Sequence, residues 1–149
     1  MEAKEYTHPD QLERYSFLWS EARLVIAAIS LLAGATPVAL RILPYALYST
    51  TTSFLVLAWI VSGATSAYLL YRWNANGKIL FGKKDALDMI AFLASAISGI
   101  NLGLTGLIRQ NIGMSIFSNS ILFSLAGLIY LAAAIHLYMK WSANGQRIF

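Results

Sequence analysis

The sequence predicts an all-α integral membrane protein with four transmembrane helices, arranged as two helical hairpins. The 149-residue chain is 58% hydrophobic and only 12% charged, far more apolar than an ordinary soluble domain. Its charged residues leave four long gaps, and each gap, with its flanks, accommodates the roughly 20 helical residues that cross a hydrocarbon core. Because lipid offers the backbone no hydrogen bonds, each crossing must be a helix. We expect the spans at residues 22–43, 51–72, 86–108 and 116–140.

Residues 1–21 precede the first span and predict a short helix of their own. Pro9 suits the first turn of a helix, and Leu12, Tyr15 and Trp19 then fall on one helical face. We therefore expect an amphipathic helix that lies at the cytoplasmic membrane surface or docks onto a partner.

Within the first span, Pro37 removes a backbone hydrogen bond and predicts a bend in the middle of the helix. Thr36 can satisfy carbonyls that the bend frees. Hydroxyl side chains cluster at residues 49–53, where they suit an outer loop and the cap of the second span. A passive pore could also use a helix bend and a cluster of hydroxyl groups, so a pore stays open as an alternative interpretation of both features.

The second and fourth spans end in the same phrase, Trp-x-Ala-Asn-Gly, at Trp73–Gly77 and again 68 residues later at Trp141–Gly145. Upstream, the offset between the two copies shifts to 65. We therefore divide the chain into an N-terminal helix (1–21) and two membrane repeats (22–82 and 83–149). Because each repeat has two spans, both repeats enter the membrane from the same side, and a pseudo-twofold axis along the membrane normal is expected to relate them.

Each phrase predicts the end of a helix. Trp73 and Trp141 suit the headgroup level, and Asn and Gly both accept the left-handed conformation that terminates helices. The functional alternative is that Asn76 and Asn144 form a cytoplasmic binding site about the pseudo-axis.

The basic residues lie mostly on one side of the predicted membrane. Nine of the eleven precede the first span, lie between the second and third spans, or follow the fourth. The positive-inside rule therefore predicts that both termini and the central loop are cytoplasmic. This placement accounts for the net charge of +4, so nucleic-acid binding is not expected.

Arg41 and Arg109 are the two exceptions, and each lies near the outer end of the first helix of its repeat. Together they are candidates for an anion site. The alternative is that each anchors its helix by extending its long side chain to the interface.

Three segments of the second repeat resemble a known family: Gly99 to Leu107 (Gly-Ile-Asn-Leu-Gly-Leu-Thr-Gly-Leu), residues 115–117 (Ser-Ile-Phe) and Gly127 to Tyr130 (Gly-Leu-Ile-Tyr). They resemble the small two-helix membrane proteins catalogued as domain of unknown function 378. Leu102 departs from the pattern, because the family usually has Trp there, and the first repeat diverges further. The resemblance implies a duplicated small integral membrane protein but no activity, because the family has none established.

Gly99, Gly103 and Gly106 lie on one side of the third span at spacings of four and three, which lets a neighbouring helix approach closely. Asn101 lies in the same span, and its amide must find a partner because lipid offers none. We expect all four residues to serve helix packing. For Asn101, a ligand or permeation contact is the alternative.

The residue types give little support for catalysis. The chain has no cysteine and two histidines, too few for a protein-only metal cage. His136 is the ionisable residue that we expect in the last apolar span, and we expect no carboxylate inside the membrane. That expectation argues against metal ligation and against proton- or sodium-coupled transport. We therefore predict no catalytic residues, no metal site and no cofactor.

The leading hypothesis is a non-enzymatic membrane protein that acts by assembly, as an accessory or structural subunit of a membrane complex or as a homo-oligomer. Its expected partners are membrane lipids, together with other copies of itself or other membrane subunits. The alternative is a passive channel or small-solute carrier with a site near the pseudo-symmetry axis.

Overall fold

A computed structural model describes residues 9–116 and 119–149, and in this part of the chain the secondary structure is helical apart from one isolated bridge. Four helices are long and apolar enough to cross a membrane. They are α2 (Pro9–Leu32), α4 (Tyr48–Ala75), α5 (Ala86–Ile108) and α7 (Ser120–Ala143). Three short elements lie in the connections: α3 (Val38–Ile42), the 3-10 helix η1 (Tyr45–Leu47) and α6 (Ile112–Ile116). The prediction of an all-helical chain with four helices able to span a membrane is confirmed.

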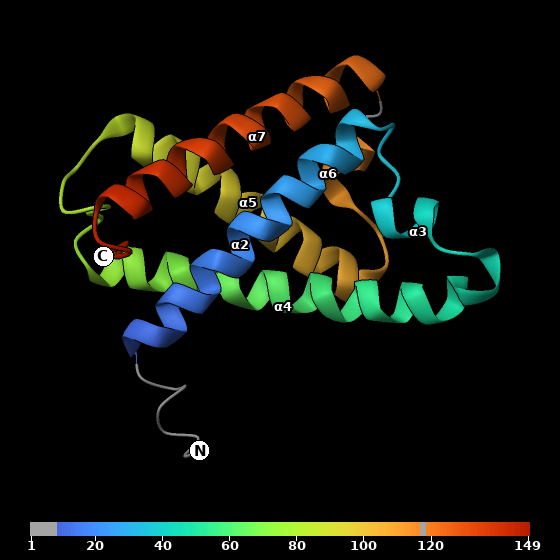
Figure 1. Cartoon of the computed structure of the whole chain (residues 1–149), viewed down its shortest axis with the longest axis horizontal. Helices are drawn as coiled ribbons and strands as arrows, with labels where there is room; N and C mark the ends of the chain where they lie inside the picture. The colour runs from blue at the N-terminus through green and yellow to red at the C-terminus, as the bar shows by residue number, and fades with distance from the viewer. Residues whose placement is uncertain (1–8, 117–118) are drawn as a thin grey trace.

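The four long helices run alternately up and down one bundle. Helices α2 and α5 begin, and α4 and α7 end, at the side where the described chain begins and ends (Figure 1); we call it the termini end. In this view α4 and α7 lie on opposite sides, with α2 and α5 between them. Helix α4 packs most extensively against α5, and α2 against α7. The largest contacts therefore join helices from different predicted repeats.

The first helix departs most from the prediction. Helix α2 runs without a break from Pro9 to Leu32, so the expected boundary between residues 21 and 22 lies inside it. Residues that we expect in a separate surface helix form instead the first half of a candidate membrane span. Residues 1–8 of that expected helix lie outside the described part of the chain.

The expected bend at Pro37 is wrong, because α2 ends before it. The chain turns at Gly34 and Ala35, whose φ angles are +92° and +60°, and the Ala35 N–H donates to the Ser30 carbonyl at 2.8 Å. Pro37 is the N-cap of α3. A proline disfavours helical conformation in the residue before it, so the first helix closes before it reaches Pro37.

The other three spans lie close to their expected positions. Helix α5 has the expected bounds, and α4 and α7 differ from residues 51–72 and 116–140 by a few residues at each end. Both ends of α4 and the C-terminal end of α7 lie beyond the apolar stretch, because flanking polar residues continue the helix. Helix α7 instead begins later than expected, at the residue after its N-cap Asn119.

The hydroxyl cluster at residues 49–53 lies inside the first turns of α4 rather than in a loop. Thr52 Oγ1 donates to the Tyr48 carbonyl at 2.8 Å and Ser53 Oγ to the Ser49 carbonyl at 3.1 Å. The N-cap is Leu47, and no side chain caps the helix. The expected capping role is therefore wrong, because these hydroxyls bond backward to carbonyls of their own helix.

Two aromatic pairs build the core at the termini end. Phe17 on α2 lies 5.4 Å from Trp141 on α7 between ring centroids, and Phe92 on α5 lies 5.6 Å from Trp73 on α4. Trp141 is buried, and Trp73 is partly buried against the same core, which also takes up Ile148. The two tryptophans thus pack into the bundle, because a phenylalanine of a neighbouring helix offers each ring an apolar partner.

Candidate functional site

The two Trp-x-Ala-Asn-Gly phrases end α4 and α7 with the same geometry. Asn76 and Asn144 are the C-caps, with φ angles of −86° and −92°. Gly77 and Gly145 follow at φ +67° and +65°, which is the left-handed conformation that glycine adopts without strain. Each asparagine amide donates to the carbonyl three residues ahead, at 3.5 and 3.0 Å. Both amides therefore close their own turns.

The three glycines of the third span all face α4. A Cβ added to Gly99, Gly103 or Gly106 would come within 3.0 Å of an atom of that helix. The closest backbone approach joins Gly63 to Gly103, where an added Cβ on either residue would lie 2.6 to 2.7 Å from the Cα of the other. This face is consequently occupied within the chain and leaves no room for a helix of a second subunit.

Asn101 joins α5 to α6 at the end of the bundle opposite the termini end. Its Nδ2 donates to Asn111 Oδ1 at 2.9 Å, and its Oδ1 accepts from the Gly113 N–H at 3.0 Å. Both ends of the amide are thus used by a connection between two spans. Asn101 therefore fastens that connection.

Arg41 and Arg109 lie at the same end of the bundle and are both exposed. Arg41 is in the last turn of α3, and Arg109 is the left-handed C-cap of α5, with φ +61°. The shared location keeps both guanidinium groups available to solvent, and an anion site formed by the two stays a prediction.

The expectation that the membrane spans contain no carboxylate is wrong. Glu13 and Glu21 lie in α2, Asp88 lies in α5, and all three are buried. The first span begins earlier than expected and so includes the two glutamates, and Asp88 lies in the first turn of α5. Helical spacing is the signal that could have located them, because Glu13 and Asp88 are each followed by Phe at the fourth residue and Ser at the seventh.

Two carboxylates at the termini end each bind the basic residue that directly precedes the tryptophan of a Trp-x-Ala-Asn-Gly sequence. Glu13 Oε2 lies 2.9 Å from Arg72 Nη2. Asp88, which has no exposed side-chain surface, places Oδ1 2.7 Å from His136 Nε2 and 3.4 Å from Lys140 Nζ. These contacts tie α2 to α4 and α5 to α7 at the termini end of the bundle.

Arg23 is a buried cation between α2 and α5. Its guanidinium donates to Ser98 Oγ at 2.9 Å and to the carbonyl and hydroxyl oxygens of Ser95 at 2.8 and 3.2 Å. Hydrogen bonds to neutral groups satisfy most of its donors, and Nε has no partner among the described residues. The sequence does not reveal this arrangement, because it depends on how α2 crosses α5.

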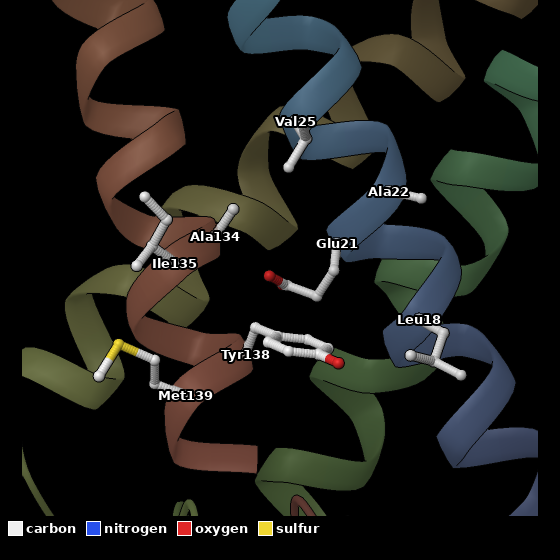
Figure 2. Close-up of a pocket in the computed structure, with 8 residues that line it drawn as sticks. All are labelled: Leu18, Glu21, Ala22, Val25, Ala134, Ile135, Tyr138 and Met139. Atoms are coloured by element: carbon white, nitrogen blue, oxygen red, sulfur yellow. The ribbon is translucent and has the colours of Figure 1, made fainter. Parts of the chain in front are cut away.

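Glu21 lies on the opposite face of α2 from Arg23. Helix residues that are two positions apart in sequence point in directions about 200° apart around the helix axis. Arg23 therefore faces α5, whereas Glu21 faces α7. Figure 2 shows the Glu21 side chain extending from α2 towards α7, beside the ring of Tyr138. Both carboxylate oxygens are buried, and neither has a hydrogen-bond partner among the residues that the structure describes.

A groove of about 430 Å³ runs between α2 and α7 at this position. Four residues of each helix line it: Leu18, Glu21, Ala22 and Val25 of α2, and Ala134, Ile135, Tyr138 and Met139 of α7. Glu21 is the one carboxylic acid among these eight residues. The other side chains are aliphatic, a thioether or aromatic. The groove is therefore an apolar surface with a single acid.

Outside the spans, Asp85 caps α5. Its Oδ1 accepts from the backbone N–H groups of Asp88 at 3.2 Å and Leu87 at 2.9 Å. These hydrogen bonds, that from Asp88 first, lower the pKa of the Asp85 carboxyl, and Lys83 adds to the effect through its charge.

Within the described residues, His, Asp and Glu nowhere gather into a group of three that could hold a metal ion. Comparison with protein-family models, with curated proteins and with solved structures finds no match to this chain. The resemblance to the two-helix family of unknown function therefore stays a prediction.

Proposed function

We propose that this chain is a non-enzymatic integral membrane protein that acts by assembly, as an accessory or structural subunit of a membrane complex or as a homo-oligomer. The observation that supports the proposal is an apolar stripe on the outer face of α4. It consists of exposed residues at spacings of three, four, three and seven: Phe54, Leu57, Val61, Ala64 and Tyr71. In α4, as in α7, 22% of the apolar stretch is buried by the rest of the chain, against 50% in α5.

The spacing of this α4 stripe is what a second helix needs. A seven-residue apolar period forms a seam that packs at a shallow crossing angle, and transmembrane bundles use the same geometry. The small side chain of Ala64 at the middle of the seam allows close approach. The glycines of α5 cannot serve this purpose, because α4 already covers them.

The proposal includes two parallel hairpins related by a pseudo-twofold axis. Two equivalent contacts support this symmetry: Phe17 packs on Trp141, and Phe92 packs on Trp73. The two phenylalanines, in the first helix of each hairpin, are 75 residues apart, and the two tryptophans, in the second helix of each hairpin, are 68 residues apart. We adopt the offset of 75 for the first helices in place of 65. The basic residues at the termini end support a cytoplasmic location for both termini.

Blue native electrophoresis of membranes solubilised in a mild detergent tests the assembly. We expect the full chain to migrate in a complex larger than its 16.4 kDa monomer. Ala64→Phe should reduce that complex, because the larger side chain separates helices at the seam. Ala86→Phe, at an exposed position in the first turn of α5, is the control and should leave the complex intact. A free monomer alone would contradict the proposal.

A passive channel or small-solute carrier is the second candidate, and the buried Arg23 between α2 and α5 favours it. A buried cation with hydroxyl partners near the proposed pseudo-axis resembles a site for an anionic or polar solute. Solute flux into proteoliposomes tests this candidate. Loss of flux on Arg23→Leu, with retained folding, would support it, and flux equal to that of empty liposomes would reject it.

A further inference from the structure

Glu21 is a buried acid that the described chain leaves without a hydrogen bond. Its side chain is 6% exposed in total, and both carboxylate oxygens lack partners among the described residues. A buried carboxyl without partners is costly in an apolar environment, and such a residue inside a membrane is by default a functional one. Donors for Glu21 must therefore come from outside the described residues, and an external ligand is one such source.

Neighbouring cations of the chain do not fill this role. Arg23 points to the other side of α2, where Ser95 and Ser98 accept its hydrogen bonds. Lys140 and His136 both lie against Asp88 between α5 and α7. None of these three side chains donates a hydrogen bond to Glu21, whose carboxylate oxygens stay without partners among the described residues.

The groove beside Glu21 fits the body of a small amphiphile. Its volume of about 430 Å³ falls in the range of ligand pockets, roughly 300–1,000 Å³. Between Leu18 and Val25 it follows α2 for about 10 Å at 1.5 Å per residue. This length suits an alkyl chain and is too short for a packed helix, and the aliphatic walls suit apolar groups.

We propose that the groove between α2 and α7 binds a hydrophobic primary ammonium ion, whose N–H groups donate to the Glu21 carboxylate and whose apolar body lies along the groove. Charge complementarity argues for this class: a cationic donor matches the unpartnered acid, and an apolar body matches the remaining walls. The proposal is independent of assembly, because α4, which carries the stripe, lies on the opposite side of the bundle from α7 (Figure 1).

Tyr138 controls access to the acid. Its ring lies beside the carboxylate (Figure 2), and the side chain is 53% exposed, so it can turn towards lipid and uncover the oxygens. With the ligand bound, the ring face provides a second favourable contact for the cation. The ammonium group thus lies between the carboxylate of α2 and the ring of α7.

Native mass spectrometry of the full chain in a non-ionic detergent tests the proposal, with dodecylamine as the probe and dodecanol as its uncharged match. Retained adducts at a series of probe concentrations give relative affinities. We expect dodecylamine to bind at least about tenfold more tightly than dodecanol, and Glu21→Gln to weaken dodecylamine about tenfold to hundredfold, the value of hydrogen bonds to a charged group.

A second variant tests the groove while Glu21 stays in place. Ala22 is exposed and lines the groove, so Ala22→Phe should fill its mouth and weaken dodecylamine at least about tenfold, since overpacking of this kind excludes a ligand. Ile26→Phe, one turn further along α2 and outside the groove, is the matched control and should bind as wild type. Equal retention of amine and alcohol, or unchanged affinity of both Glu21→Gln and Ala22→Phe, would overturn the proposal.

The ammonium group could come from a lipid headgroup or from a free amine in the membrane. Nanodiscs with and without phosphatidylethanolamine distinguish these sources. If the lipid headgroup is the ligand, dodecylamine should bind more weakly in discs that contain this lipid, because the two compete. The lipid should then also co-purify with the wild-type protein but not with Glu21→Gln. Equal dodecylamine binding in both discs identifies a free amine. The same spectra report the oligomeric mass, so a failure of assembly is seen separately.

Discussion

Replacing Gly103 by alanine should separate α4 from α5 and destabilise the fold. A Cβ at this position would lie 2.6 Å from the Cα of Gly63, and because backbone cannot rotate out of the way, the helices must move apart by about 1 Å to restore ordinary contact. Overpacking costs about 1–3 kcal/mol, and because this contact is with backbone we take the upper part of that range, about 2–3 kcal/mol. The better helix propensity of alanine offsets roughly 1 kcal/mol, so we expect a net loss of about 1–2 kcal/mol.

The assay is reversible unfolding of the purified chain in mixed micelles with increasing denaturing detergent, followed by circular dichroism. Leu104→Ala, at the next residue on the lipid-facing side of α5, is the control for an ordinary truncation and should change stability less. Gly63→Ala should resemble Gly103→Ala. The double variant should cost less than the sum, because once the helices have moved apart the second methyl group has room.

A Gly103→Ala variant as stable as wild type would refute this reasoning. Additive effects of the two substitutions would also contradict it, because additivity indicates that the residues do not share one contact.

Two further predictions concern the acids at the termini end. Asp88→Ala should destabilise the chain by about 2–3 kcal/mol in the same assay, because it removes charge-assisted bonds to His136 and Lys140, and Asp88→Asn, which keeps the shape, should cost about half as much. The lowered pKa of Asp85 means that its ionised form stabilises the folded chain above the ordinary pKa of 3.8. That contribution is lost as the pH falls through the lower folded pKa, so thermal unfolding between about pH 2 and 6 should show less pH dependence in Asp85→Ala.

The third span was predictable from sequence because its ends are marked chemically. Asp85 precedes the helix as an N-cap, and Arg109 follows it in the left-handed conformation, so charge placement and apolar length give the same bounds. The stops at Asn76 and Asn144 were predictable for a similar reason, since Asn-Gly carries a local conformational preference that tertiary structure does not change.

The first span was not predictable in the same way. Hydropathy treats Glu13, Glu21 and Arg23 as surface residues, whereas the fold buries all three. Two of them are compensated by partners 59 to 75 residues away, and a local window cannot include such partners. The candidate site at Glu21 was missed for the same reason, because α7 supplies its other wall.

The packing of α2 against α7 is the central claim, because it creates the groove that holds Glu21. The chain has no cysteine, so a double variant Leu32→Cys and Gly127→Cys tests this packing directly. A Cβ at Gly127 would meet Leu32 Cγ at 2.9 Å, within reach of a disulfide once the leucine is replaced. We predict rapid intramolecular cross-linking on oxidation, and none for Ala64→Cys with Gly127→Cys, which lie on helices at opposite sides of the bundle (Figure 1). Free thiols in the first variant, or equal cross-linking in both, would contradict the arrangement.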